Sequence, residues 1–219
     1  MKKIYIYQRF ERFWHWSQAI LIIFLALTGF EVHGTFHILG FEQAARYHRV
    51  ASWILIVLIV FAIFWHFATG EWKQYLPTTK KLKEQLLYYS LGMFKGEKHP
   101  TNKTELSKLN PLQRLVYLGF KLVLIPLTLI SGVFYMLHKT IDENNVVIVE
   151  DIPLGTIAFW HTLGAMLLMA FLVVHVYMTT TGHSPTSNIN AMITGYEELE
   201  DENDEPEENS TKINQPEKQ

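Results

Sequence analysis

The chain has 219 residues, of which 49% are hydrophobic and 14% aromatic, and its formal net charge at pH 7 is −2. It contains no cysteine, which excludes disulfides, thiolate-bound iron–sulfur clusters, zinc–thiolate sites and covalently attached c-type haem. The small net charge combines a basic middle with an acidic end, so the net charge itself says little about partners, among which we expect no nucleic acid.

The apolar residues are gathered into four long blocks, whereas the charged residues lie between and after them. Blocks of this length are typical of helices that cross a bilayer, since about 20 apolar residues span the hydrocarbon core. We predict an all-α integral membrane protein, a four-helix transmembrane bundle formed by residues 1–196, with helices at about 13–32, 46–68, 111–137 and 158–181. The first block lacks a small-residue cleavage pattern, so we expect it to remain in the mature protein.

The first half of the chain begins with a short basic segment that contains Arg9 and Arg12. An aromatic cluster around His15 opens the first block, as expected at a membrane boundary. The second block carries His48 near its start and His66 near its end.

The second half begins with a lysine-rich connection over residues 69–110, in which residues 79–89 show the periodicity of a surface amphipathic helix. The third block contains Pro126, which predicts a kink that a membrane helix tolerates. The fourth block holds His161 and His175 and has no acidic or basic residue between positions 159 and 181. Residues 197–219 are acidic and low in complexity, and we predict a disordered cytoplasmic tail.

The distribution of lysine and arginine predicts the orientation of the bundle. Twelve of these residues lie in the N-terminal segment and in the connection between the second and third blocks, whereas the other two connections hold mainly Arg46, Arg49 and Lys139. By the positive-inside rule, both termini and the long connection are expected in the cytoplasm of a bacterium, with the protein in its inner membrane.

His161 and His175 are fourteen residues apart, so both project from nearly the same helix face and are separated by about 21 Å. Imidazole is the commonest protein ligand for metals, including haem iron, and a titratable side chain inside lipid is costly. The topology pairs His48 with His161 at the outer level and His15 with His175 at the inner level. Each pair comes from two helices, which is how a bundle clamps a flat macrocycle.

Two alternatives remain open at this point. His66 lies on the same face as His48 and competes with His15 as the inner partner of His175. The histidines are also explained by hydrogen bonds between helices, without any metal. Histidines in the polar connections are expected to be solvated, namely His33, His37, His99, His138 and His183.

Small and basic residues are consistent with a macrocycle but do not require one. Gly29, Gly132 and Gly164 fall near the outer level, where a missing side chain leaves room for a ring edge or simply allows close helix packing. Arg12 on the inner side and Arg49 on the outer side are candidates to neutralise haem propionates, or to act as interfacial anchors.

The motifs together resemble a known family. They comprise Arg12-Phe13-Trp14-His15-Trp16, Thr28-Gly29, Tyr47-His48-Arg49, Trp160-His161 and Val174-His175. Their order and spacing are similar to the membrane cytochrome b subunits of nickel–iron hydrogenase, formate dehydrogenase (the gamma subunit) and thiosulfate reductase. The resemblance covers residues 9–196.

This resemblance implies two haem b groups, ligated by His48 and His161 on the outer side and by His15 and His175 on the inner side. It implies electron transfer between the quinone pool (menaquinone or ubiquinone) and a periplasmic redox subunit, either an iron–sulfur protein or a multihaem cytochrome. The stretch Lys108-Leu109-Asn110-Pro111-Leu112-Gln113-Arg114 is similar to a quinone-binding segment of the formate dehydrogenase branch. Asn110 and Gln113 are therefore candidate quinone ligands, or else ordinary helix-capping residues.

The expected function is that of a quinone-reactive di-haem electron-transfer subunit of a larger oxidoreductase, with the thiosulfate reductase branch favoured by the compact outer loops. The only chemistry expected on this chain itself is that of quinone and quinol. The alternatives are a stand-alone di-haem quinol oxidase that reduces superoxide or metals, and a transporter that uses histidines to bind transition metals.

Overall fold

The computed structural model describes residues 2–96, 100, 108–143, 152–182 and 184–199. Four helical segments in this part of the chain are long and apolar enough to cross a membrane: Arg9–Val32, Phe41–Thr69, Pro111–His138 and Leu154–Thr179. The shortest has 24 residues and so extends roughly 36 Å at 1.5 Å per residue, which exceeds the thickness of the hydrocarbon core. The prediction of a helical membrane bundle is confirmed.

Helix α1 (Arg9–Val32) and helix α2 (Phe41–Thr69) form one hairpin. Helix α2 begins five residues before the predicted start, because the connection is held by a buried carboxylate. Glu31 accepts hydrogen bonds from the backbone N–H groups of Ile38, Leu39 and Gly40, and Gly40 adopts a φ of +82° that a glycine tolerates. These contacts turn the chain tightly enough for the helix to start at Phe41.

The third span is interrupted by a π-helical turn. It consists of α4 (Pro111–Gly119), the π-turn η4 (Phe120–Leu124) and α5 (Ile125–Glu143). Pro126 lacks an N–H donor, and its ring would clash with the carbonyl group four residues earlier in a regular α-helix. The wider π-turn directly before Pro126 accommodates this clash, so the kink predicted at Pro126 takes the form of a π-bulge.

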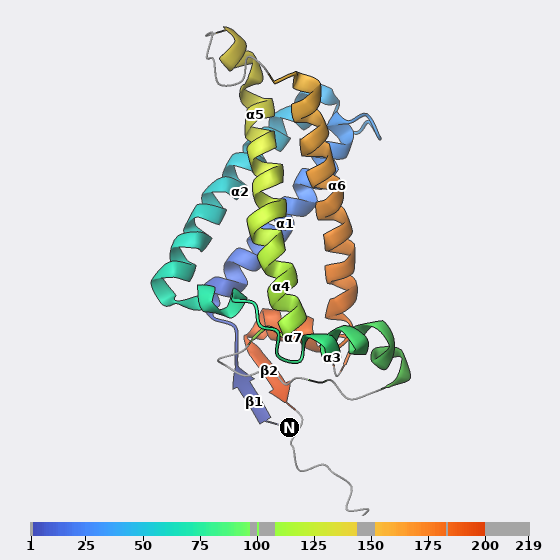
Figure 1. The fold of residues 1–219 in the computed structure, drawn as a ribbon. Helices are drawn as coiled ribbons and strands as arrows, with labels where there is room; N and C mark the ends of the chain where they lie inside the picture. Colours follow the sequence, from blue (N-terminus) through green and yellow to red (C-terminus); the bar gives the residue numbers. More distant parts are fainter. Residues whose placement is uncertain (1, 97–99, 101–107, 144–151, 183, 200–219) are drawn as a thin grey trace, which may run out of the picture.

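Helix α6 (Leu154–Thr179) packs along α5 and forms the second hairpin, and the two helices run side by side in Figure 1. Close backbone contacts are concentrated within each hairpin. In the first hairpin, small residues of α2 permit this approach, since Ala44, Ala51 and Ala62 are all buried. The histidine pairs lie between the two hairpins.

Both ends of the described chain meet at one end of the bundle (Figure 1). Strand β1 (Lys2–Tyr5) pairs antiparallel with β2 (Tyr196–Leu199), with Lys2 opposite Leu199 and Tyr5 opposite Tyr196. The strands thus place both termini on the same side of the four spans. Strand β2 includes the first three residues of the segment predicted as a tail, and residues 200–219 lie outside the described part.

Short helices also gather at this end, below the spans in Figure 1. The helical run that contains the predicted amphipathic segment begins three residues later than the periodicity indicates, at Leu82, and continues beyond its predicted end to Lys95. The elements are the 3₁₀ turn η1 (Glu71–Tyr75), α3 (Leu82–Leu87), the π-turn η2 (Tyr88–Gly92), the 3₁₀ turn η3 (Met93–Lys95) and α7 (Ser187–Thr194).

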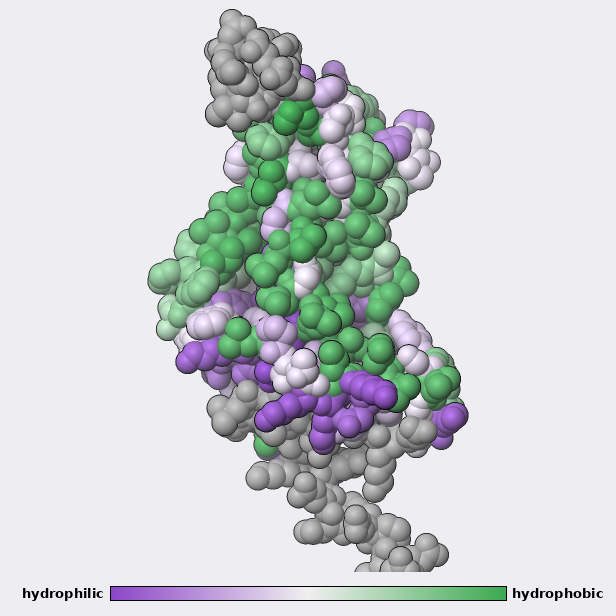
Figure 2. Space-filling view, viewed as in Figure 1, coloured by the Kyte–Doolittle hydropathy of each residue, from purple (hydrophilic) through white to green (hydrophobic). Residues whose placement is uncertain are grey.

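The surface separates into an apolar body and a polar end (Figure 2). Large apolar side chains are exposed along the four spans, including Phe61, Phe64, Leu122 and Val173. On the face shown in Figure 2, the hydrophilic residues concentrate at the end that carries the short helices. This distribution is that of a protein whose middle is solvated by lipid.

Candidate haem-binding site

The structure brings His48 of α2 and His161 of α6 together. Their ring centres lie 6.2 Å apart, and the ring planes are nearly perpendicular, at 86°. The two residues are 113 positions apart in the chain, so only the packing of the two hairpins creates this pair. The structure therefore brings together the two histidines that the sequence predicts as the outer pair.

Hydrogen bonds define which nitrogen of each outer histidine is available. The Thr28 hydroxyl donates to the carbonyl of Phe24 at 2.9 Å, so it accepts from Nδ1 of His48, 3.0 Å away. His161 Nδ1 donates to the carbonyl oxygen of Thr128 at 3.1 Å. Both rings therefore carry their proton on Nδ1, and the Nε2 lone pair is left for a metal.

Two glycines make room for these imidazoles. A Cβ added at Gly29 would lie 3.3 Å from Cε1 of His48, and one added at Gly132 would lie 2.9 Å from Cε1 of His161. Gly164 serves helix packing instead, since a Cβ there would meet Thr128 Oγ1 at 2.5 Å. The backbones of α1 and α5 therefore pack directly against the imidazoles of His48 and His161.

The inner pair has the same separation. The ring centres of His15 on α1 and His175 on α6 lie 6.2 Å apart, with 53° between the planes. Phe171 stacks on His175 with its ring centre 5.7 Å away, and Tyr117 Oη lies 3.5 Å from His175 Nδ1. His15 Nδ1 is buried and has no hydrogen-bond partner among the described residues.

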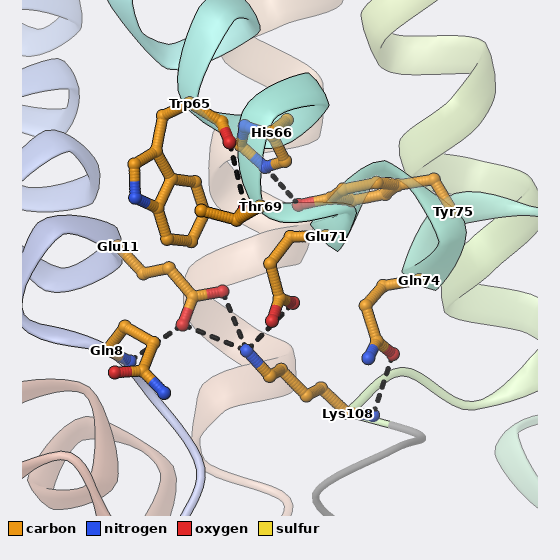
Figure 3. A network of polar contacts seen from close by, with 9 residues as sticks. All are labelled: Gln8, Glu11, Trp65, His66, Thr69, Glu71, Gln74, Tyr75 and Lys108. Carbon is orange, nitrogen blue, oxygen red and sulfur yellow. Dashed lines mark hydrogen bonds and ion pairs between the residues drawn. The ribbon is translucent and has the colours of Figure 1, made fainter.

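His66 is engaged elsewhere and does not face His175. Its Nδ1 donates to the carbonyl oxygen of Ala62 at 2.6 Å, so Nε2 is the acceptor of the Tyr75 hydroxyl at 3.3 Å (Figure 3). Burial raises the pKa of Tyr75, which keeps its phenol protonated as this donor. Both ring nitrogens of His66 are therefore satisfied within the protein, and the geometry favours His15 as the inner partner.

The remaining histidines lie away from both pairs or outside the described residues. His33 and His37 are exposed in the connection between α1 and α2, in agreement with the expectation of solvation. His138 is half-buried near the end of α5. His99 and His183 lie outside the described part of the chain.

Asn110 and Gln113 form a capping box at the start of α4. Asn110 Oδ1 accepts from the backbone N–H of Gln113 at 2.8 Å, and Gln113 Oε1 accepts from the backbone N–H of Asn110 at 3.1 Å. Asn110 Nδ2 also donates to the Tyr89 hydroxyl at 3.0 Å. The Asn110 side chain therefore serves the helix cap and contacts Tyr89, whereas the N–H₂ group of Gln113 has no acceptor among the described residues.

Lys108, the first residue of the same stretch, is a buried structural cation. Its Nζ contacts both carboxylate oxygens of Glu11 at 2.9 Å and Oε2 of Glu71 at 3.0 Å (Figure 3). Its backbone N–H also donates to Oε1 of Gln74. This network fixes the start of the third span to the ends of the first two.

The two arginines predicted as propionate partners lie in different surroundings. Arg12 Nη1 donates to the carbonyl oxygen of Ile193 in the last turn of α7, where the helix dipole favours a cation. Its Nε is buried without a partner in the described part of the chain. Arg49 is exposed next to His48.

The donor set fits haem iron. An imidazole nitrogen binds a first-row metal at about 2 Å, with the ring centre about 1 Å farther, so two imidazoles on one metal have centres roughly 6 Å apart. Both pairs meet this distance at 6.2 Å. Among the described residues no group of three His, Asp or Glu side chains gathers to hold a bare ion. Two axial imidazoles suffice when a macrocycle supplies the other ligands.

Comparisons with known proteins agree with this geometry. The model of the prokaryotic cytochrome b561 family matches residues 6–195. Cytochrome YdhU of Escherichia coli (strain K12) is 27% identical over 89% of this chain and 75% of its own length. Two Ni/Fe-hydrogenase B-type cytochrome subunits are also similar. That of Rhizobium leguminosarum bv. viciae is 23% identical over 93% of this chain and 92% of its own length. That of Azotobacter vinelandii is 24% identical over 91% of this chain and 90% of its own length. No solved structure matches significantly.

Proposed function

The chain belongs to the prokaryotic cytochrome b561 family and is a membrane b-type cytochrome of electron transport, and from this premise we propose that it is a di-haem subunit that connects the quinone pool to a redox partner outside the membrane. The observation that carries the proposal is the presence of two histidine pairs with equal ring separations of 6.2 Å, one near each end of the bundle. Two redox groups in series are what a relay across a bilayer requires.

In this proposal His48 and His161 hold the outer haem and His15 and His175 hold the inner one. Held by two imidazoles, each haem would supply one-electron transfer and would leave no position for a substrate. The side chains around each pair orient the ligands. Thr28 and the carbonyl of Thr128 hold the outer imidazoles through Nδ1, which fixes the tautomer that binds metal.

A quinone is the proposed electron carrier on the cytoplasmic side. Gln113 is retained as a proposed contact because its amide N–H₂ group stands at the start of the third span, at the membrane boundary. Asn110 contributes by holding Gln113 in the capping box, while its own amide donates to the Tyr89 hydroxyl. Both residues stay in the proposed quinone site, menaquinone or ubiquinone being the substrate.

The proposed orientation places both termini in the cytoplasm and the 33–40 connection in the periplasm, in a bacterial inner membrane. The pairing of β1 with β2 supports it, because it joins both terminal segments on the side of the lysine-rich connection. The names of the hydrogenase subunits support a redox enzyme as the partner at the other side. A partner of the thiosulfate reductase type is part of the proposal, on account of the compact outer connection.

The test is haem quantification in single variants of the detergent-purified chain. We expect about two haem b per wild-type chain by pyridine haemochrome, and about one in His161→Ala and in His175→Ala, with different spectral components lost. His66→Gln is the matched control, because it removes a buried imidazole at the same membrane level as His175. This variant should keep both haems. A chain without haem, or loss of haem in His66→Gln with retention in His175→Ala, contradicts the proposal.

A further inference from the structure

Lys121 places an ammonium group inside the third span. It belongs to the π-turn η4, whose extra residue rotates the following side chains relative to a regular α-helix. Its Nζ lies over the face of the Tyr75 ring, 3.3 Å from the ring centre, and 5.7 Å from the ring centre of Trp14. A lysine within a membrane span is costly to bury, and it indicates a function when no partner neutralises it.

The carboxylates nearest to this region are already paired. Both oxygens of Glu11 and one oxygen of Glu71 contact Nζ of Lys108, as Figure 3 shows. Tyr75 offers Lys121 only its ring, since its hydroxyl is directed to His66. Among the described residues, the ammonium of Lys121 therefore has aromatic faces as neighbours and no ion pair or hydrogen bond, and the Glu11 carboxylate that acts on it electrostatically is itself held by Lys108.

A second donor in the same place also lacks an acceptor. The indole Nε1 of Trp14 is buried without a hydrogen-bond partner among the described residues. The Trp14 ring packs edge-on against His66, at 5.7 Å between ring centres, and Trp14 directly precedes His15 of the inner pair. An ammonium and a buried indole N–H thus share one place beside the inner histidines, which is the composition of an anion-binding site.

We propose that Lys121 and Trp14 bind a carboxylate of the inner haem. The inference rests on the proposed function, because it requires a haem held by the adjacent His15. Haem b carries two carboxylates, and an anionic oxygen inside a membrane protein needs charge-assisted hydrogen bonds. The ammonium supplies the countercharge, the indole N–H supplies a directed donor, and the Tyr75 ring stabilises the cation from the other side.

This assignment differs from the partner expected from the sequence alone. One guanidinium nitrogen of Arg12 donates to the carbonyl of Ile193 near the end of α7, so this contact holds Arg12 at that helix. Lys121 Nζ makes no such hydrogen bond among the described residues, and Lys121 lies in a different span from either inner histidine. A contact from the third span would hold the macrocycle from the side, while α1 and α6 hold it through the iron.

The experiment measures the midpoint potentials of both haems by spectroelectrochemical titration in four variants of the full chain. Lys121→Gln removes the cation, Lys121→Arg keeps it, and Trp14→Phe removes the indole N–H. Lys73→Gln is the matched control, because it removes a lysine from the exposed surface of η1 near the same end of the bundle. The inner haem is identified as the component that His175→Ala eliminates.

We expect Lys121→Gln to shift the inner potential downward, because an unpaired carboxylate stabilises the ferric form, and to leave the outer potential unchanged. Lys121→Arg and Lys73→Gln should stay close to the wild type, and Trp14→Phe should give a smaller downward shift. Selective loss of the inner haem in Lys121→Gln, with both haems kept in Lys121→Arg, also supports the inference.

Unchanged inner potential and haem content in Lys121→Gln overturn the inference. A second ligand with an oxygen acceptor for the ammonium is a quinone, and it is tested by the dissociation constant of a soluble naphthoquinone analogue. Weaker binding of that analogue in Lys121→Gln, with an unchanged inner potential, assigns the site to quinone and overturns the carboxylate. A wild-type chain without two haems would instead contradict the proposed function itself.

Discussion

Gly132 on α5 and His161 on α6 are in direct contact, because a Cβ built on Gly132 would lie 2.9 Å from Cε1 and 3.1 Å from Nδ1 of the imidazole. Real Cβ atoms essentially never approach other heavy atoms below 3.0 Å, so any side chain at position 132 must displace the ring. The His161 ring is also fixed by its hydrogen bond to the carbonyl of Thr128, which lies on α5 like Gly132. The position of the His161 ring therefore depends on the absence of a side chain at residue 132.

We expect Gly132→Ala to disturb the outer haem and to leave the inner one intact. The added methyl group pushes the His161 ring away from its place opposite His48, so haem content should fall from about two per chain towards about one. Gly119→Ala is the control, since a Cβ at that position of the same span has nothing within 4 Å. The measurement is haem per chain together with the reduced-minus-oxidised spectrum, and equal loss in both variants would contradict the explanation.

Thr28→Val is expected to raise the midpoint potential of the outer haem. The hydroxyl of Thr28 accepts from His48 Nδ1 at 3.0 Å, and in the proposed site this hydrogen bond would make the imidazole a stronger electron donor that stabilises ferric iron. Valine has nearly the same shape but no acceptor, so the ferric form loses that stabilisation. Thr28→Ser should retain the wild-type potential. A downward shift, or a shift confined to the inner haem, would show that this hydrogen bond does not tune the outer site.

The spans and the histidine pairs could be predicted from the sequence for a simple physical reason. Apolar blocks of membrane length define helices regardless of tertiary detail, and alternating helix direction fixes the depth of each residue. Depth alone therefore predicts the pairing of His48 with His161. The choice between His15 and His66 could not be made by depth, because it depends on rotation about the helix axis, which the structure supplies through the contacts of His66 with Ala62 and Tyr75.

Other features depend on contacts that leave little trace in the sequence. The acceptor for His161 is a backbone carbonyl, which any residue at position 128 would provide. The strand pair β1–β2 joins residues nearly 200 positions apart, and neither strand exceeds four residues. Pro126 predicts an irregular helix. The residue does not reveal that the irregularity is a π-turn that contains Lys121. The early start of α2 required knowledge of where the Glu31 carboxylate points.

Lys108→Met should destabilise the protein strongly. The ammonium is 7% exposed and lies between the carboxylates of Glu11 and Glu71, so its removal leaves a buried and a half-buried anion close together. Removing one partner of a buried ion pair typically costs about 3–5 kcal/mol. The check is the unfolding midpoint of the detergent-purified variant, with Lys73→Met as the exposed control.

The double variant Glu11→Gln/Lys108→Met tests the cause of that loss. Because it removes one of the stranded carboxylates, it should be more stable than Lys108→Met alone. If both variants unfold at the same temperature, the loss comes from packing of the lysine chain and the ion pair is not its origin.

The two roles of the Asn110–Gln113 pair can be separated by substitutions that keep the helix cap. Asn110→Asp retains the oxygen that accepts from the backbone of Gln113, and an acidic residue at a helix N-terminus is favourable, so stability should remain close to the wild type. It removes the amide N–H donor that contacts Tyr89. Asn110→Ala removes the cap as well and should cost about 1 kcal/mol.

Gln113→Glu completes the comparison, because it keeps an oxygen for the backbone N–H of Asn110 and loses the N–H₂ group. If that group donates to a quinone carbonyl, the Michaelis constant for a quinone analogue should rise roughly tenfold, the effect of about 1.4 kcal/mol for one lost hydrogen bond. The unfolding midpoint should change little. A variant with unaltered kinetics would limit Gln113 to helix capping. The quinone carbonyl would then require a donor from another residue of the inner end, and the Tyr117 hydroxyl, 3.5 Å from His175 Nδ1, is one such group.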